Sequence, residues 1–533
     1  MIKRKIIFLI IIILSIIAIQ ACVTNYYFRY VYKDANSLLR NKNINEKYFL
    51  KAHLKNGDVC ILRDTWKVDT LSSVLIGKGE RFDFKRNIIS EGDISIPFDS
   101  IAIYETNKKI VDAESSRLLA LGIIDAFDVV GGLLCLTHPK YCFGSCPTFY
   151  LNENDNFHFA NAEGFSNAIS PSMEYTDIDA LNNGTILNNI FSLTMKNEAL
   201  ETHCVNSVNI LAFPRKKRER VYNSPKNKFF LCENLYLANL AKVNNKDITQ
   251  NIKIDDRYEY FSPSDIDNLK SKEEIYLTYE NVNNSSNLGL LVNFRQTLMT
   301  TYFIYNAIGY MGDEVSDIFA KFESNCKIAT NIKDGIKNEL GDIELYLWDD
   351  NSKSWTYQDS LYETGPIAIN RQILPLKSKS NNSTINLKIV LNKGLWRIDY
   401  LALTNFKKEV EPIEISPSGV LNNGKNDDFS LGLLKNPNKY LISMPGSEYR
   451  FHYVLPKNNQ DYELFLSSKG YYLEWMRKDW LQEKDLFKLY TMFENPKKYL
   501  KDEAHSFKLY ESRLEKEFWD SKIDKKKFSY YAK

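Results

Sequence analysis

Apolar and polar residues alternate with a period of two over much of the C-terminal half of the chain. Residues 343–348 and 385–391 place their apolar side chains on one face, and residues 396–402 do the same after the turn Asn392-Lys393-Gly394. Successive side chains of a strand point to opposite faces, so this alternation predicts strands with one buried face. Short strands at spacings of about 8–12 residues predict an antiparallel β-sandwich domain over residues 331–470.

A shorter stretch, residues 47–106, alternates in the same way on both sides of the turn signal Asn56-Gly57-Asp58. Asn-Gly sequences favour tight hairpin turns, so the flanking strands are predicted to pair with each other. We expect a small β domain over residues 22–110.

The segment between these two β regions, residues 111–330, mixes two periodicities. Residues 112–136 and 294–311 carry apolar side chains at helical spacing, whereas residues 191–195 and 205–213 follow a strand pattern. Charged residues interrupt the apolar surface of the first helix, which argues against a membrane span there. We therefore expect a central mixed α/β domain with a buried helix.

Helical spacing returns in a C-terminal helical segment, residues 471–533. Asn495-Pro496 combines an N-cap residue with a proline at the first helical position, and Phe507 and Leu514 belong to a later apolar stripe. Together the patterns predict an α+β fold of several domains in which β-structure dominates.

The N-terminus carries the pattern of an export signal. A basic segment, Lys3-Arg4-Lys5, precedes an apolar run over residues 6–19 that only Ser15 interrupts. The run is shorter than the roughly 20 residues of a membrane-spanning helix and has the length of a signal-peptide core. Residues 1–21 are therefore predicted to be a signal peptide; the alternative is an uncleaved single membrane anchor.

The four residues Ile19-Gln20-Ala21-Cys22 resemble the lipobox of bacterial lipoproteins, although Gln20 departs from the small or aliphatic residue usual at its position. The resemblance implies cleavage before Cys22, lipidation of that residue with palmitate or a similar acyl chain, and attachment to a membrane through the lipid. It also implies a location in the bacterial cell envelope, facing the periplasm or the cell exterior.

The composition is that of a globular protein of 533 residues, 44% hydrophobic and 26% charged. Its 69 Lys and Arg nearly balance its 67 Asp and Glu, which argues against a dedicated nucleic-acid-binding protein. Loss of the three basic residues of the signal segment leaves 66 basic against 67 acidic residues. The slight positive charge therefore belongs to the export signal.

Eight cysteines are present, and seven remain if Cys22 is lipidated. Cys142 and Cys146 flank Gly144, whose conformational freedom allows a tight turn, so they are the best candidates for a disulfide. Cys135 is a competing partner, and buried free thiols are the alternative. The stretch Cys-Phe-Gly-Ser-Cys-Pro also resembles one in uncharacterised secreted bacterial proteins, a resemblance that implies no activity.

One polar cluster has the residue types of a catalytic or metal site. Glu201 and His203 share a face if they lie on a strand, and Glu198 is close in sequence. Two carboxylates and an imidazole could hold a metal or act as acid and base. Further ligands would have to come from Glu163, Glu174, Asp177 or Asp179. The alternative is ordinary surface polar residues, and we expect no cofactor.

Three tryptophans in the predicted sandwich suggest recognition through aromatic rings. Trp348 and Trp355 lie beside acidic residues, and Trp396 lies beside Arg397. An aromatic surface with polar groups suits a sugar, which has an apolar ring face and a hydroxyl edge; burial of Trp348 and Trp396 in the core is the alternative. The sequence thus predicts a noncatalytic binding or structural protein of the envelope that contacts a glycan or another envelope protein. The alternative is a hydrolase or metal-dependent enzyme with a site near Glu198–His203.

Overall fold

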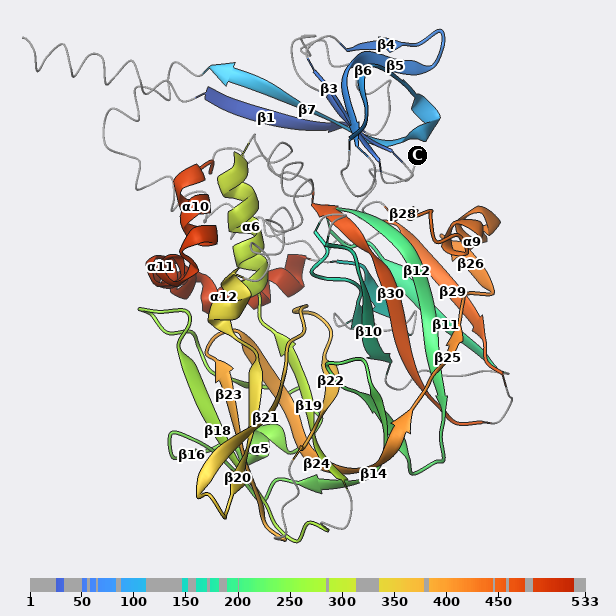
Figure 1. Ribbon diagram of the computed structural model, residues 1–533. Helices are drawn as coiled ribbons and strands as arrows, with labels where there is room; N and C mark the ends of the chain where they lie inside the picture. Colours follow the sequence, from blue (N-terminus) through green and yellow to red (C-terminus); the bar gives the residue numbers. More distant parts are fainter. Residues whose placement is uncertain are drawn as a thin grey trace, which may run out of the picture. The chain divides into compact units, whose positions relative to one another are not determined.

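In the computed structural model (Figure 1) the chain forms two compact units. The structure describes residues 25–32, 50–54, 58–63, 66–82, 88–111, 146–151, 160–169, 173–181, 189–199, 201–283, 287–312, 335–377, 383–443, 446–456, 460–474 and 483–521. The predicted lipidation site Cys22, the predicted disulfide partner Cys142 and the helix expected over residues 112–136 lie outside these ranges.

The smaller unit contains one antiparallel sheet in the order β1-β7-β2-β3-β5-β4, with β6 paired to β5. Its buried side is formed by residues such as Leu50, Leu62, Leu75 and Ile96, which recur at alternate positions, together with Trp66. The hairpin predicted around residues 56–58 is the β2–β3 pair. The elements are β1 (Asn25–Tyr32), β2 (Leu50–Leu54), β3 (Val59–Leu62), β4 (Lys67–Asp69), β5 (Val74–Phe82), β6 (Ile88–Pro97), the short 3₁₀ helix η1 (Phe98–Ser100) and β7 (Ile101–Val111).

Within its described residues, the larger unit contains four sheets, two of which are built mainly from residues 148–214 and 413–474. The β12 sheet consists of β10 (Tyr175–Leu181), β30 (Tyr462–Glu474), β12 (Glu201–Pro214), β25 (Ile413–Ile415) and β28 (Leu441–Ser443). The β11 sheet consists of β27 (Lys425–Asn426), β26 (Gly419–Asn422), β29 (Glu448–Val454), β11 (Ile190–Lys196), β8 (Thr148–Tyr150) and β9 (Ala162–Glu163). A buried hydrogen bond from the Tyr453 hydroxyl to the Val208 carbonyl, 3.0 Å long, joins the two sheets.

The other two sheets of the larger unit draw their strands from residues 220–410. The β24 sheet consists of β14 (Phe229–Leu237), β13 (Arg220–Asn223), β22 (Asn370–Pro375), β19 (Asn287–Gln296), β24 (Trp396–Val410) and β17 (Tyr260–Phe261). The β20 sheet consists of β16 (Lys246–Asp247), β15 (Leu240–Val243), β18 (Lys272–Tyr279), β23 (Ile385–Asn392), β20 (Ile343–Asp349) and β21 (Ser354–Leu361). The short helix α5 (Thr249–Ile252) lies beside these strands (Figure 1).

In the β20 sheet, the alternation of residues in the sequence produces one buried side and one partly exposed side. Ile343, Leu345 and Leu347 are buried on its inner side, whereas the intervening Tyr346 and Trp348 are partly exposed on the outer side. Strand β19 is buried along nearly its whole length, because it pairs with β22 on one side and β24 on the other.

Helices follow the last strand, β30, as the sequence predicts, although residues 471–474 of the predicted helical segment still belong to that strand. Tyr302 and Phe303 of α6 contact Phe507 and Tyr499, with ring centroids 5.3 and 6.0 Å apart respectively. The Asn495 side chain accepts a hydrogen bond from the Lys498 N–H, so it caps α11 as expected. The C-terminal helices are α10 (Leu486–Glu494), α11 (Pro496–Asp502) and α12 (Ala504–Ser521). Earlier in the chain are α6 (Met299–Met311), α9 (Asp428–Leu434) and a helical stretch over residues 335–340.

Two expectations from the sequence differ from the structure. The helix predicted from Phe294 begins only at Met299, because residues up to Gln296 belong to the paired strand β19. The predicted boundary at residue 330 does not separate these sheets, since β18 pairs with β23 and β19 pairs with β22. Within the described residues, no helix has the length and apolar character required to span a membrane.

Candidate functional site

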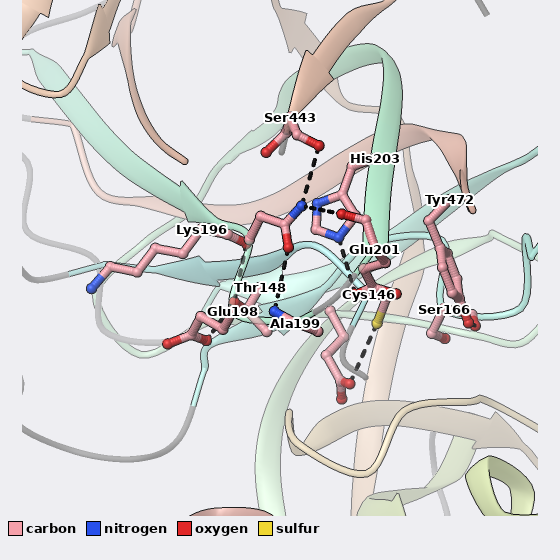
Figure 2. Close-up of polar contacts among 12 residues, drawn as sticks. Cys146, Thr148, Ser166, Lys196, Glu198, Ala199, Glu201, His203, Ser443 and Tyr472 are labelled. Atoms are coloured by element: carbon pink, nitrogen blue, oxygen red, sulfur yellow. Dashed lines mark hydrogen bonds and ion pairs between the residues drawn. The ribbon is translucent and has the colours of Figure 1, made fainter. Parts of the chain in front are cut away.

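The Glu201–His203 pair lies at the start of β12, in the larger unit. The two residues sit on the same side of the strand, with Nε2 of His203 3.1 Å from Oε1 of Glu201 (Figure 2). Both side chains are completely buried. The period-two argument from the sequence therefore placed these two side chains together correctly, whereas their burial differs from the exposed polar surface that was the alternative.

Glu198 belongs to a different set of contacts. One of its carboxylate oxygens accepts hydrogen bonds from the hydroxyls of Thr148 (2.8 Å) and Tyr150 (2.5 Å), both on β8. Burial and the neighbouring Glu198 carboxylate raise the pKa of Tyr150 well above its usual value, so this phenol stays protonated and donates. Glu198 thus links the residues that follow β11 to strand β8, and these contacts go to the two β8 hydroxyls rather than to His203 (Figure 2).

Of the carboxylates proposed as additional ligands, Glu163, Asp177 and Asp179 are also buried, whereas Glu174 is partly exposed. Oε2 of Glu163 accepts hydrogen bonds from the backbone N–H groups of Ile367 (2.6 Å) and Ala368 (2.8 Å). Asp177 and Asp179 lie on β10, and burial raises the pKa of Asp177 to about 6 and that of Asp179 well above its usual range. Glu174 forms an ion pair with Lys469, 3.7 Å long. In the part of the chain that the structure describes, no group of three or more His, Cys, Asp or Glu residues is arranged to hold a metal ion.

Cys146 lies against these carboxylates as a buried free thiol. Its Sγ donates to Oε1 of Glu163 at 3.5 Å, and burial together with the charges of Glu163 and Glu201 raises the thiol pKa well above its usual value. A reactive cysteine needs a positive environment that favours the thiolate, and Cys146 has the opposite. Cys142, the predicted disulfide partner of Cys146, lies outside the described residues.

A second region, on the outer side of the β20 sheet, gathers exposed aromatic side chains. Trp348 and Trp355 face each other across the β20–β21 hairpin in an edge-to-face arrangement, with ring centroids 5.2 Å apart. Tyr276 approaches Trp355 to 5.7 Å, and Tyr346 approaches Tyr357 to 5.6 Å. We call these five residues, Tyr276, Tyr346, Trp348, Trp355 and Tyr357, the aromatic face.

The rings of the aromatic face are partly open to solvent. Tyr276 is 41% exposed and Tyr357 is 46% exposed, and the other three are partly exposed. Trp396, in contrast, is 1% exposed and contacts the rings of Phe294 and Tyr362. The sequence alternative of core burial therefore holds for Trp396 and not for Trp348.

Charged and polar groups are interleaved with these rings. The Lys388 ammonium lies 5.0 Å from the Tyr346 ring and 5.5 Å from the Trp355 ring, and it pairs with Glu274 at 2.9 Å. Lys377 lies 5.3 Å from the ring of Tyr357. The indole N–H of Trp348 donates to Asp350 at 3.1 Å, so the tryptophan edge is oriented by a neighbouring carboxylate.

Sequence reasoning found the two tryptophans of the aromatic face and missed its three tyrosines. The alternation of residues 343–348 puts Tyr346 on the same side as Trp348, so Tyr346 could have been found from the sequence. Tyr276 reaches the face because β18 pairs with β23, which no local pattern shows. No protein family model matches the sequence, and a search of curated proteins finds no significant match.

Proposed function

We propose that the protein is an exported, lipid-anchored protein of the bacterial cell envelope that binds a glycan noncatalytically through the aromatic face. The observation that carries this proposal is the gathering of five aromatic rings on the outer side of one sheet. Large rings usually lie in the core, so a contiguous exposed cluster suggests a binding surface.

The chemistry of the aromatic face suits a sugar. A pyranose presents C–H groups on its ring faces, which pack on aromatic rings, and hydroxyls at its edge, which need hydrogen-bond partners. Lys388, Glu274 and Asp350 provide such donors and acceptors within the same surface. A face built on paired strands holds its rings in fixed positions, which reduces the entropy lost on binding.

Glycan binding can be tested with the purified full-length chain in detergent, by co-sedimentation with insoluble glycans such as peptidoglycan and chitin and by a glycan array. We expect Trp355→Ala and Trp348→Ala each to weaken binding about tenfold, which corresponds to about 1.4 kcal/mol. Tyr258→Ala is the matched control, because Tyr258 is an aromatic residue that is 79% exposed outside the aromatic face. Unchanged binding by a Trp348→Ala/Trp355→Ala double variant would refute the role of this face.

The lipid anchor rests on the sequence at Cys22 and needs a separate test. Radiolabelled palmitate should be incorporated into the full-length chain made in bacteria, and Cys22→Ala should abolish the label. Cys232→Ala, which alters a buried thiol, is the control that should keep it. Labelling of the Cys22→Ala variant at the wild-type level would exclude acylation at this residue.

A hydrolase or metal-dependent enzyme is the second candidate, and the contact between Glu201 and His203 is the observation that favours it. Both side chains are fully buried, so a substrate would have to reach them through a movement of the chain. Metal analysis and hydrolase assays of Glu201→Gln and His203→Gln test the idea. Metal content and activity equal to those of the wild type would eliminate it.

A further inference from the structure

Strands β1 and β7 of the smaller unit form a two-stranded ribbon that continues past the neighbouring strand β2 (Figure 1). Strand β1 pairs along its whole length with residues 104–111 of β7. Strand β2 pairs with β7 only as far as Thr106. Among the described residues, residues 25–29 and 107–111 therefore pair only with each other, and we call these ten residues the β1–β7 extension.

The β1–β7 extension is basic and aromatic. Phe28 lies opposite Lys108, and Tyr27 lies opposite Lys109. Cross-strand partners share a face of a ribbon and successive residues alternate between faces, so each face carries a ring and a basic residue. The β1–β7 extension contains no Asp or Glu, and its basic and aromatic residues are Arg29, Lys108, Lys109, Tyr26, Tyr27 and Phe28.

Within the described chain, the β1–β7 extension lacks the third strand that usually stabilises a sheet. A pair of strands by itself is only marginally stable in water, because it needs a further strand or a packed layer. Ile110 and Val111 add aliphatic residues to the three aromatic ones, so half of the β1–β7 extension is apolar. A partner surface that accepts both rings and positive charges would stabilise this ribbon.

The position of the β1–β7 extension in the chain indicates a membrane as this partner. Asn25 follows the predicted lipidation site Cys22 by three residues, which span at most about 11 Å. Lipid chains on Cys22 would bring the start of β1 to the bilayer surface, and an uncleaved anchor over residues 6–19 would do the same. Aromatic rings favour the headgroup level of a bilayer, and each basic residue near an anionic bilayer strengthens binding about fivefold.

We propose that the β1–β7 extension binds the headgroup layer of an anionic phospholipid bilayer. Its basic residues supply attraction to the lipid phosphates, and its rings supply affinity for the boundary between headgroups and acyl chains. The smaller unit is then held at the membrane by one end of its sheet as well as by the lipid. The inference rests on the proposed attachment of the N-terminus to a membrane, and it is independent of glycan binding by the aromatic face.

The test is hydrogen exchange of the full-length chain, made in bacteria, purified in detergent and transferred to vesicles. One kind of vesicle contains phosphatidylcholine alone, and the other also contains about one third phosphatidylglycerol. We expect the amides of residues 25–32 and 104–111 to exchange about fivefold more slowly on the anionic vesicles. Because salt screens charges, this difference should disappear at about 1 M salt. Equal exchange on the two kinds of vesicle would overturn the proposal.

Flotation of the same samples separates the role of the β1–β7 extension from that of the lipid anchor. A chain that floats with both kinds of vesicle but exchanges equally on them would keep the anchor and refute only the β1–β7 extension as a binding surface. A chain that floats only with the anionic vesicles and exchanges slowly there would support the β1–β7 extension and contradict the anchor. Flotation with neither kind would overturn both. Slowing that rises with protein concentration in detergent alone would assign the edge strand β1 to a second copy of the chain and overturn membrane binding.

Variants assign the effect to the charges of the β1–β7 extension. Lys108→Glu/Lys109→Glu should abolish the slowing on anionic vesicles, whereas Lys108→Arg/Lys109→Arg keeps both charges and should retain it. Lys67→Glu/Lys78→Glu is the matched control, because it reverses two exposed lysines on β4 and β5 of the same sheet. An equal loss of slowing in the control would attribute the effect to the charge of the whole unit and contradict the proposal. Circular dichroism of each variant establishes that it is folded.

Discussion

The carboxylate of Glu163 occupies the space in which a side chain on Gly365 would begin. A Cβ atom added to Gly365 would lie 2.5 Å from Oε2 of Glu163, and the φ angle of Gly365 is +120°. The same Oε2 accepts the N–H groups of Ile367 and Ala368. Glu163 on β9 therefore holds a loop 204 residues further along the chain, and glycine is required where the loop passes the carboxylate.

We predict that Gly365→Ala lowers the free energy of unfolding by about 2–4 kcal/mol. An unfavourable φ contributes about 1–3 kcal/mol, and overlap with the carboxylate contributes a similar amount. Urea denaturation followed by circular dichroism measures the change. Gly424→Ala is the control, because Gly424 also has positive φ (+79°) but nothing within 4 Å of its added Cβ. Equal losses in the two variants would show that the contact with Glu163 contributes nothing.

We expect the buried Trp396 and the partly exposed Trp355 to differ in how much they contribute to the free energy of unfolding. We predict that Trp396→Ala lowers the free energy of unfolding by about 3–5 kcal/mol, since it removes a fully buried ring. Trp355→Ala removes a partly exposed ring with edge contacts and should cost about 1 kcal/mol. Thermal and urea unfolding of both variants measure this difference. A loss of 3 kcal/mol or more in Trp355→Ala would indicate that the aromatic face is part of the core.

Local patterns predicted those features that depend on neighbours in the sequence. The strict alternation of residues 343–348 and 385–391 predicted β20 and β23, and the spacing of two placed Glu201 beside His203. The helix at Phe294 was predicted too early because β19 is apolar on both faces, and a continuous apolar run satisfies helical spacing as well. Periodicity alone cannot distinguish a strand that is apolar on both faces from an apolar helix.

A small pocket lined by Cys146, Glu163, Gln296 and Glu474 could not be predicted from the sequence, because these residues are far apart in it. Glu163 on β9, Gln296 on β19 and Glu474 on β30 belong to three different sheets, so they meet only where those sheets pack together. The close approach of Glu163 to Gly365 could not be predicted for the same reason. The burial of Asp177 and Asp179 could not be predicted from the sequence either, since both side chains would be solvated in an isolated strand.

The cap of α11 gives a prediction about local stability. Asn495 accepts the Lys498 N–H, so Asn495→Ala should destabilise the helix by about 1 kcal/mol. Hydrogen exchange of the amides of residues 497–502 should accelerate about fivefold, since 1 kcal/mol corresponds to that factor. Asn495→Ser keeps an acceptor at the cap and should exchange at nearly the wild-type rate. Equal acceleration in both variants would indicate that the cap hydrogen bond is not responsible.

Asp399 on β24 is a buried carboxyl group whose surroundings favour its protonated form. It is completely buried and accepts the Arg257 N–H at 2.8 Å. Burial and the neighbouring Asp255 raise the pKa of Asp399 to about 7. Asp255 itself contacts the guanidinium of Arg371. Glu259, which pairs with Arg295, adds further negative charge near Asp399.

This pair predicts that stability falls as the pH rises from about 5 to about 7. The usual pKa of an aspartate is 3.8, so between that value and about 7 the folded chain holds a proton that the unfolded chain has lost. The free energy of unfolding then decreases with pH by up to about 1.4 kcal/mol per unit from this group. Asp399→Asn keeps an acceptor for Arg257 and removes the titration, so its stability should vary less steeply with pH.

Because Asp177 and other buried acids add slopes of the same sign, the decisive quantity is the difference in the free energy of unfolding between variant and wild type, measured by urea titrations at pH 5, 6, 7 and 8. Parallel curves over this range would show that Asp399 does not bind the proton, whereas a variant that gains relative stability up to pH 7 and is constant above it would confirm the assignment.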